Sequence, residues 1–227
     1  AYEIPKRDWS SDVCSSDLGH PFNEVQLENF LDRLNEAEKY GIKPVVTHFS
    51  NSAATLSNRA AHFNLVRLGI VMYGLSPDVN TMGDSKILGL KPAMTLRARL
   101  QLVKDVPAGS PVGYGGTVAT SRDTKVGVVA MGYADGVPRN ASPVAGVLAG
   151  NSRAPILGRV SMDQFVVDLG PESKLKPGDW VYLFGEPTNS LGTSDGYTAD
   201  MWGAACGTIN YEIVTRIGPR VPRIYLN

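Results

Sequence analysis

The sequence predicts an α/β segment followed by an all-β domain. The first observation is the order of helix, strand, helix and strand patterns early in the chain. The second is a change of texture at Met94, after which short β-favouring runs alternate with clusters of Gly, Pro, Asn and Asp. The third is the turn-rich stretch SPDVNTMGDSK between the two textures, which places a domain boundary near Lys86.

The first predicted element is an amphipathic helix over residues 23–40. Its apolar residues recur at steps of three and four, and Gly41 follows as a stop signal. The apolar stripe consists of Val25, Leu27, Phe30, Leu31, Leu34 and Ala37.

Two strand patterns flank a second expected helix. KPVVTH (residues 43–48) and FNLVRLGIVMYGL (residues 63–75) have the apolar character of buried strands. SNSAATL (residues 50–56) has the pattern of a loop that opens a helix. Strands that alternate with helices in this way predict βα units around a parallel sheet or barrel.

The second part of the chain is rich in short strand patterns. Closely spaced strands of this kind indicate an antiparallel sandwich or barrel. One helix is expected at TADMWGAACG, residues 198–207, and NYEIVTRI, residues 210–217, then resumes a strand-like pattern. The expected strands are MTLRARLQLVKDV, TKVGVVAMGY, APILGRV, QFVVDL and DWVYLF.

Composition argues against several classes of protein. Lys plus Arg and Asp plus Glu both number 22, so the charge excess of nucleic-acid and membrane-surface binders is absent. No apolar run approaches the roughly 20 residues of a membrane helix, and residues 1–6 lack the apolar centre of a signal peptide. We therefore expect a cytoplasmic protein with neither nucleic acid nor membrane as a partner. Cys14 and Cys206 fit no metal spacing, so neither a metal site nor a disulfide is expected.

The first candidate site residues lie in HFSNSAA. His48 and Ser52 follow the predicted strand at its carboxyl end, which is the edge where βα barrels bind ligands. A serine beside free backbone donors suits a phosphate. The alternative is that Ser52 only caps the following helix.

The stretch VRLGIVMYG carries a second group of candidates. Arg67 lies within an apolar pattern, where a buried guanidinium would need a partner. Gly69 permits close backbone approach, and the amides of Gly69 and Ile70 are possible anion donors. The alternative is a strand-end arginine that reaches solvent along its stem.

The β-rich part adds two candidate tyrosines and one candidate amide. Tyr133 stands between Gly132 and Gly136 in VVAMGYADGVPRN, so we expect a tight turn that displays its phenol. A phenol acts as a base at neutral pH only where its surroundings favour phenolate. In GRVSMDQF the backbone amide of Met162 could bind a carboxylate. Tyr211, in NYEIV, could donate its hydroxyl to a phosphate, although strand tyrosines are commonly structural.

Taken together, six motifs resemble the alanine racemase family in order and approximate spacing. They are HFSNSAA, VRLGIVMYGL, GYADGVPR, GRVSMDQ, INYEIVTRIG and RVPRIY, and the resemblance covers nearly everything from Gly19 to Asn227. It implies a remnant of a pyridoxal-phosphate-dependent (β/α)8 barrel in residues 19–85, followed by a β-barrel or sandwich domain in residues 86–227. It also implies a homodimer and a small amino acid as substrate.

The resemblance assigns roles to the candidate residues. Ser52, Gly69, Ile70 and Tyr211 resemble the ligands of the cofactor phosphate. Arg67 resembles the group that faces the pyridine nitrogen, and His48 resembles the residue that orients this arginine. Tyr133 resembles the catalytic base, and the Met162 amide resembles the contact to the substrate carboxylate.

The family's reaction requires two acid/base groups that flank the α-carbon of the substrate. Tyr133 can be only one of them. The resemblance implies that the other is a lysine that also holds pyridoxal phosphate covalently, and that the tyrosine comes from the neighbouring subunit. No stretch of the 227 residues resembles the family's lysine motif, so we expect this chain by itself to be inactive.

The stretch DWSSDVCSSDL, residues 8–18, stands where the rest of the barrel would be expected. It resembles the translation of a sequencing adapter, so we expect residues 1–18 to be a non-native leader and the resemblance to begin abruptly at Gly19. The alternative is a disordered polar linker.

The sequence therefore predicts a fragment of an alanine racemase, whose parent interconverts L-alanine and D-alanine for peptidoglycan synthesis. One alternative is a β-domain module that dimerises or binds without catalysis. Others are a serine or broad-specificity racemase, or a decarboxylase on the same plan, although the GYADG and SMDQ motifs favour a racemase.

Overall fold

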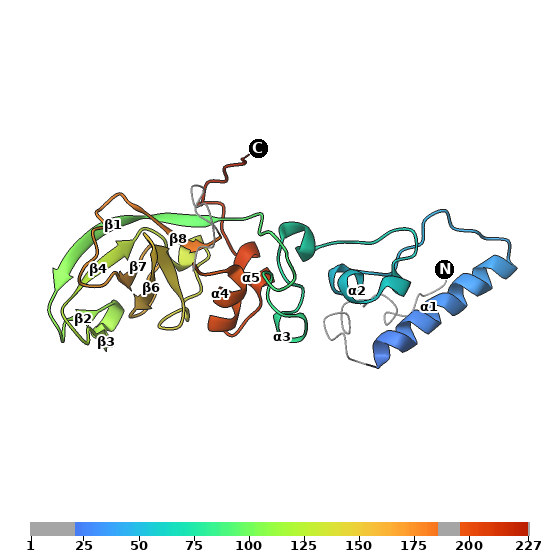
Figure 1. The fold of residues 1–227 in the computed structure, drawn as a ribbon, viewed down its shortest axis with the longest axis horizontal. Helices are drawn as coiled ribbons and strands as arrows, with labels where there is room; N and C mark the ends of the chain where they lie inside the picture. Colours follow the sequence, from blue (N-terminus) through green and yellow to red (C-terminus); the bar gives the residue numbers. More distant parts are fainter. Residues whose placement is uncertain (1–20, 186–195, 227) are drawn as a thin grey trace. The chain divides into compact units, whose positions relative to one another are not determined.

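The structure, a computed structural model, describes residues 21–185 and 196–226 (Figure 1). The chain divides into two compact units, Ala1–Lys91 and Pro92–Asn227. The expected leader, residues 1–18, lies outside the described residues, and the domain limits drawn from the sequence stay a prediction.

The long helix expected in the first unit is confirmed as α1, Phe22–Lys39. Its C-terminal end has the backbone that the sequence pattern predicted: Gly41 takes a φ of 76°, and Ile42 N–H donates to Ala37 O at 3.0 Å. A left-handed glycine closes a helix in this way because it has no Cβ to clash. The ring of Phe30 contacts those of Phe49 and Phe63, with centroids 5.2 and 5.3 Å apart.

The strands predicted at residues 43–48 and 63–75 do not form. Among the described residues of this unit, their only β pairing is one parallel bridge between His48 and Leu65. The side chain of Asn64 accepts from Thr47 N–H at 2.7 Å and donates to Val45 O at 2.8 Å. An apolar run becomes a barrel strand only when neighbouring strands pair with its backbone and helices cover its faces; instead, Val45 is 88% exposed.

Short helical turns complete this unit. The helix expected to open at SNSAATL is confirmed as α2, Ser52–Ser57. It is followed by η1, Arg59–Ala61, η2, Ile70–Tyr73, and α3, Val79–Met82. The turn η2 occupies part of the predicted second strand.

The second unit is a closed antiparallel barrel, which confirms the predicted all-β architecture. The strands follow one another around the barrel as β1-β4-β7-β6-β5-β8. Their bounds are β1 Leu96–Val106, β4 Thr124–Val129, β5 Gly146–Ala149, β6 Ser152–Leu157, β7 Phe165–Asp168 and β8 Trp180–Phe184. A small hairpin, β2 Pro111–Val112 with β3 Val118–Ala119, encloses the turn η3, Tyr114–Gly116.

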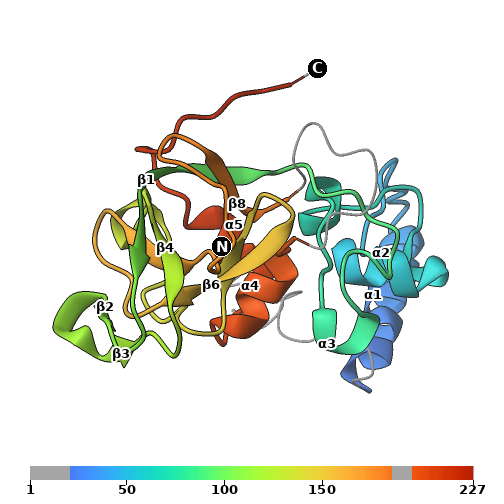
Figure 2. The ribbon, with the colours of Figure 1, turned by 60° about the vertical axis from the view of Figure 1, so that its left-hand side comes forward.

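Strand β1 closes the barrel because it serves two neighbours. Its first half pairs with β8 from Leu96 to Arg99, and its second half pairs with β4 from Leu100 to Val106. The register shifts between Leu100 and Leu102, and such an irregularity lets a strand bend from one side of a barrel to the other. In Figure 2 the strand arches across the barrel that it completes.

Two helices lie side by side against the barrel (Figures 1 and 2). The first, α4, Ala199–Ala205, confirms the helix expected at residues 198–207. The second, α5, Asn210–Thr215, replaces the strand predicted at NYEIVTRI, so that prediction is wrong. Ile213 of this helix is buried, and α5 packs against α4. A short apolar run is compatible with either a helix or a strand, and its packing partners decide which one forms.

The core of this unit lies inside the barrel and under α4. Trp202 of α4 is 1% exposed, and its Nε1–H donates to Leu183 O of β8 at 2.6 Å. A buried indole with a satisfied N–H anchors a helix through both area and a hydrogen bond. The other large, fully buried side chains are Leu100, Val129, Val147, Ile156, Val160, Phe165, Val167, Val181, Leu183, Asn210 and Ile213. Within the described ranges, no helix has the length and apolar character needed to cross a membrane.

We expect protease to cut the first unit before the barrel unit. Val45, Met72 and Tyr73 are 88%, 70% and 62% exposed, and a region with few buried contacts opens locally at low cost. Limited digestion with thermolysin, followed by mass spectrometry, should yield an intermediate that retains residues 92–185. Equal resistance of both units would contradict this expectation.

Candidate functional site

The turn η4, Tyr133–Asp135, displays the strongest candidate residue. It follows strand β4, and Tyr133 is 41% exposed, as the sequence predicted. Its backbone is tied to the loop after β6, because Tyr133 N–H donates to Ser161 O at 3.0 Å and Ala134 N–H donates to Met162 O at 2.9 Å. The structure therefore brings the turn of Tyr133 to the turn of Met162, which is itself 53% exposed.

Glycine is required on both sides of Tyr133. A Cβ on Gly132 would lie 2.3 Å from Met162 O and 2.4 Å from Ser161 O. Gly136 has a φ of 112°, and a Cβ there would lie 2.4 Å from Arg216 O. Backbone atoms cannot rotate away as side chains can, so the tyrosine is held between two glycine contacts.

Arg220 forms an ion-pair network with two carboxylates at this turn and at the neighbouring loop, which the sequence did not predict. Arg220 Nε lies 3.2 Å from Asp135 Oδ1, and Arg220 Nη2 lies 2.7 Å from Asp163 Oδ1. The hydrogen bond that Arg220 donates to Asp163 and the nearby charge of Asp135 raise the pKa of the Arg220 guanidinium. Asp135 is 7% exposed, and its Oδ2 accepts from Gly132 N–H at 2.9 Å, so this carboxylate is held within the turn. The sequence showed only the motif RVPRIY; the pairing of Arg220 with Asp163 spans 57 positions.

Ser52, Gly69 and Ile70 come together in the first unit. Ser52 Oγ, 5% exposed, accepts from Gly69 N–H at 2.8 Å and from Val71 N–H at 3.5 Å. Ile70, between them, begins η2. The alternative that Ser52 caps α2 is wrong, because the cap is Asn51, whose side chain accepts from Ala54 N–H at 3.1 Å.

His48 and Arg67 lie on the two paired segments of the same unit. His48 forms the isolated bridge with Leu65, and Arg67 N–H donates to Ser50 O at 2.9 Å. Both side chains are exposed. Of the two interpretations of the apolar pattern around Arg67, this exposure agrees with the arginine that reaches solvent. Among the described residues, the only β pairing of this segment is the bridge between His48 and Leu65.

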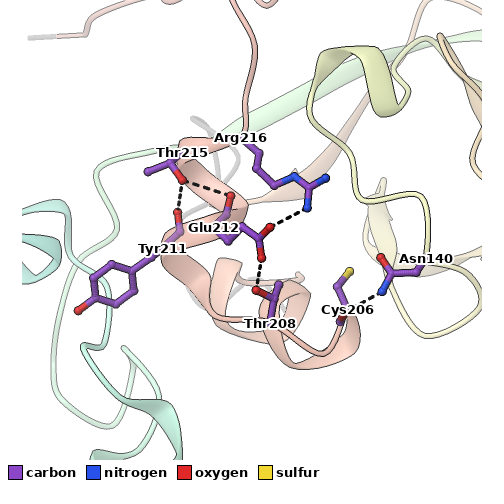
Figure 3. Close-up of polar contacts among 7 residues, drawn as sticks. All are labelled: Asn140, Cys206, Thr208, Tyr211, Glu212, Thr215 and Arg216. Carbon is purple, nitrogen blue, oxygen red and sulfur yellow. Dashed lines mark hydrogen bonds and ion pairs between the residues drawn. The ribbon is translucent and has the colours of Figure 1, made fainter. Parts of the chain in front are cut away.

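Tyr211 belongs to helix α5, not to a strand. Its ring points away from a group of polar side chains on and beside this helix (Figure 3). In that group Glu212 accepts hydrogen bonds from Thr208 and from Arg216, the latter at 2.8 Å. The hydroxyl of Thr215 donates to Tyr211 O at 2.7 Å. These hydrogen bonds stabilise the short helix that carries Tyr211.

Two pKa shifts occur beside this helix. The hydrogen bond from Thr208, with a smaller contribution from Arg216, lowers the pKa of Glu212. Burial raises the pKa of the Cys206 thiol, which keeps it protonated and unreactive. In the part of the chain that the structure describes, no three His, Cys, Asp or Glu side chains gather as a possible metal site.

Comparison with known families decides what this arrangement belongs to. Residues 93–225 match the model of the alanine racemase C-terminal domain, and residues 9–77 match that of the alanine racemase N-terminal domain. The chain belongs to the alanine racemase family. The alanine racemase of Salinispora arenicola is 50% identical over 218 residues, and that of Streptomyces coelicolor is 48% identical over 221 residues.

Solved racemase structures share the fold. The alanine racemase of the D-cycloserine producer Streptomyces lavendulae superposes with a TM-score of 0.85 at 48% identity, covering 94% of this chain and 54% of that one. The biosynthetic alanine racemase of Pseudomonas aeruginosa gives 0.79 at 39% identity, with coverages of 94% and 55%.

The chain spans about half the length of its curated relatives. The matched region covers 96% of this chain, but only 56% of the Salinispora arenicola racemase and 54% of the Streptomyces coelicolor racemase. The N-terminal match begins at residue 9, so the expectation that the resemblance begins at Gly19 is wrong. The foreign origin of residues 8–18 stays a prediction.

We expect Gly132→Ala to destabilise the barrel unit more than Gly150→Ala. The new methyl group of the first variant meets backbone oxygens, which costs about 2–3 kcal/mol. Gly150 has a φ of 61°, and a Cβ there would have nothing within 4 Å, so its variant bears only the left-handed strain of about 1–2 kcal/mol. Urea unfolding followed by tryptophan fluorescence measures both, and equal losses would contradict the backbone contact.

We expect the stabilising effect of Glu212 to depend on pH. Its pKa is lowered from an ordinary 4.5, so its contribution is present above pH 4.5 and is lost as the pH falls through the lowered value. Above pH 4.5, Glu212→Gln should unfold at lower urea than the parent chain, and the two curves should converge in more acidic buffer. A constant difference at every pH would show that the carboxylate charge has no role.

Proposed function

We propose that the complete protein to which this chain belongs is an alanine racemase that interconverts L-alanine and D-alanine. The observation that carries the proposal is the exposed phenol of Tyr133, held between two obligatory glycines beside the Met162 turn. The identity of about half of all residues to proteins named alanine racemase supports this choice.

Tyr133 would serve as the acid/base group on one face of the substrate. The residue is 41% exposed on its turn. In one direction of the reaction it would take the proton from one face of the α-carbon, and in the reverse direction it would deliver a proton to that face. A proton-transfer group of this kind contributes about 10²–10⁴-fold to a rate. Racemisation needs a second group on the opposite face, which a lysine would supply.

The turn at Met162 would hold the substrate carboxylate through its backbone amide. A main-chain N–H is a fixed donor that costs no side-chain ordering when a ligand binds. Because this turn accepts hydrogen bonds from the backbone of Tyr133 and Ala134, the donor to the carboxylate and the acid/base phenol belong to one framework.

The cofactor expected from the family is pyridoxal phosphate, which when bound makes the α-proton of the substrate removable by withdrawing electrons. The group around Ser52 has donors of the kind that suit its phosphate: a buried hydroxyl lies at the start of a helical turn beside the amides of Gly69 and Val71, which donate to that hydroxyl in this structure. Ser52, Gly69, Ile70 and the Tyr211 hydroxyl are the proposed phosphate ligands.

Arg67 would face the pyridine nitrogen of the cofactor, with His48 orienting it. A guanidinium stays charged at all physiological pH values, so it disfavours a proton on the neighbouring nitrogen and moderates the electron withdrawal by the ring. Exposure of the Arg67 side chain in this chain leaves it available for such a contact.

The functional molecule would be a homodimer in the cytoplasm that acts on a small amino acid. The homodimer and the location follow the family resemblance and stand as parts of the proposal. By itself the 227-residue chain would be inactive, because none of its stretches resembles the family's lysine motif. Incubation with pyridoxal phosphate and borohydride should then label exposed lysines only partially, and no single lysine should carry one cofactor per chain.

A hybrid enzyme tests the proposal. Residues 21–227 of this chain would replace the matching part of the Streptomyces coelicolor alanine racemase, with which the chain shares 48% identity. We expect the hybrid to convert L-alanine to D-alanine, measured by chiral chromatography, and to bind pyridoxal phosphate, measured by absorbance. Tyr133→Phe should lower kcat at least about 100-fold without loss of the cofactor absorbance.

Tyr40→Phe is the matched control, because Tyr40 follows the last residue of α1, has no proposed role and is 78% exposed. It should leave kcat unchanged. A hybrid that folds and binds the cofactor but racemises alanine equally fast with Phe at position 133 would overturn the role of Tyr133. Preference for serine over alanine would favour the alternative of a serine or broad-specificity racemase.

A further inference from the structure

Helix α5, which carries Tyr211, is too short to be stable by itself. It has six residues, Asn210–Thr215, and no side chain caps its N-terminus, where Ile209 occupies the cap position. Isolated helices of this length do not persist in water, and in proteins they depend on tertiary packing. The direction in which Tyr211 points therefore depends on the contacts that α5 makes with the rest of the barrel unit.

A buried hydrogen bond between side chains joins the start of α5 to α4. Asn210, the first residue of α5, donates from its side-chain amide to Asp200 Oδ1 of α4. Asn210 is 2% exposed and Asp200 is 3% exposed. A hydrogen bond to a carboxyl group is stronger away from water, and a buried polar group that loses its partner is costly. The Asp200–Asn210 pair therefore holds the first turn of α5 on α4.

The backbones of α4 and α5 also meet at this point. A Cβ on Gly203 of α4 would lie 2.9 Å from Asn210 N and 2.9 Å from the carbonyl carbon of Ile209. Thr208 N–H, in the connection between the two helices, donates to Gly203 O at 2.9 Å. The glycine sets how closely α5 approaches α4, and the Asp200–Asn210 pair sets which side of α5 faces it.

We propose that Asp200 and Asn210 are positioning residues for the phosphate of pyridoxal phosphate and act through Tyr211. Tyr211 directly follows Asn210, so its side chain leaves the helix about 100° further round. When the side chain of Asn210 is held inward, the ring of Tyr211 is turned to another side, as Figure 3 shows. This inference rests on the proposed function, in which the hydroxyl of Tyr211 contacts the cofactor phosphate.

A tyrosine that donates to a phosphate needs a fixed direction. Its hydroxyl lies at the far end of the side chain, so a small rotation of α5 moves the hydroxyl further than it moves the backbone. A hydrogen bond to an anion is shorter than a neutral one and about twice as strong, so a displaced donor loses much of its contribution. Loss of the Asp200–Asn210 pair should therefore weaken cofactor binding, whereas the proton transfers belong to other groups.

Hydrogen exchange on the full chain tests the Asp200–Asn210 pair without reference to catalysis. In Asn210→Asp two carboxyl groups face each other in a buried position, so α5 should open more readily. The amides of Glu212 and Ile213, which donate to Ile209 O, should then exchange about tenfold faster. Adding Asp200→Asn places a donor opposite an acceptor again, so the double variant should exchange at nearly the parent rate.

Asp168→Asn is the matched control for loss of stability. The side chain of Asp168 is 12% exposed, and like that of Asp200 it accepts a hydrogen bond from another side chain, here the hydroxyl of Thr124 at 2.5 Å. It belongs to β7, where Arg122 is its ion-pair partner at 3.0 Å. This variant should destabilise the barrel unit without changing exchange in α5 or the affinity for pyridoxal phosphate.

Titration of the hybrid enzyme, freed of cofactor, with pyridoxal phosphate tests the positioning role by absorbance. Asn210→Asp should raise the Kd about tenfold and change kcat at saturating cofactor little, and adding Asp200→Asn should restore the Kd. Tyr211→Phe should also raise the Kd. Asn210→Asp should add little to the effect of Tyr211→Phe, because Asn210 acts through the Tyr211 hydroxyl and the two changes remove one contact.

The variants separate positioning from its alternatives. An unchanged Kd in Asn210→Asp would overturn the proposal, since the buried Ile213 would then orient α5 by itself. A full further loss of affinity when Asn210→Asp is added to Tyr211→Phe would also overturn it. If Asn210→Asp does not fold, the double variant with Asp200→Asn decides, and a Kd well above that of the parent would contradict the pair.

Failure of the proposed function is recognised separately. If Tyr211→Phe leaves the Kd unchanged, Tyr211 is not a ligand of the cofactor phosphate, and the positioning role falls with it. The exchange rates of the Glu212 and Ile213 amides still decide whether the Asp200–Asn210 pair holds α5.

Discussion

The display of Tyr133 depends on backbone packing that leaves no room for a side chain. Gly132 lies against the carbonyl oxygens of Ser161 and Met162, and Gly136 lies against that of Arg216. Hydrogen bonds from Tyr133 and Ala134 to the carbonyls of Ser161 and Met162 complete the contact. A tyrosine fixed in this way combines an exposed side chain with a rigid backbone. An acid/base group needs both when its hydroxyl must reach one particular proton of a bound substrate.

The barrel makes this contact possible because it places the ends of strands that are distant in sequence together. The turn of Tyr133 follows β4, and the loop of Ser161 and Met162 connects β6 to β7, which itself pairs with β4. Strand β1 closes the ring by pairing with β8 through one half and with β4 through the other. Closure removes the free sheet edges, so the site stands on a framework with few ways to shift.

The first unit shows the opposite situation. Its apolar runs are exposed, and Asn64 bonds the backbone of Val45 and Thr47 where a neighbouring strand would otherwise do so. Yet the hydroxyl of Ser52 still meets the amides of Gly69 and Val71. Such a local arrangement of donors forms from two short segments, whereas a barrel strand requires partners on both sides. This difference explains why donors suited to a phosphate can be present in a unit in which the predicted strands do not form.

Local patterns in the sequence determined α1 and its glycine stop, the exposed turn of Tyr133, the motifs of the racemase family and every strand of the described barrel except β5, which the sequence analysis did not predict. These features depend on residues close together in the chain, where periodicity and turn chemistry act directly. The helical state of residues 210–215, the failure of residues 43–48 and 63–75 to form strands, and the role of Asn51 as the cap of α2 were decided by packing and by available partners. The meeting of Arg220 with Asp135 and Asp163 was also decided only by the tertiary structure. No local pattern encodes an ion pair between residues 57 positions apart, because the closed barrel alone brings them within reach.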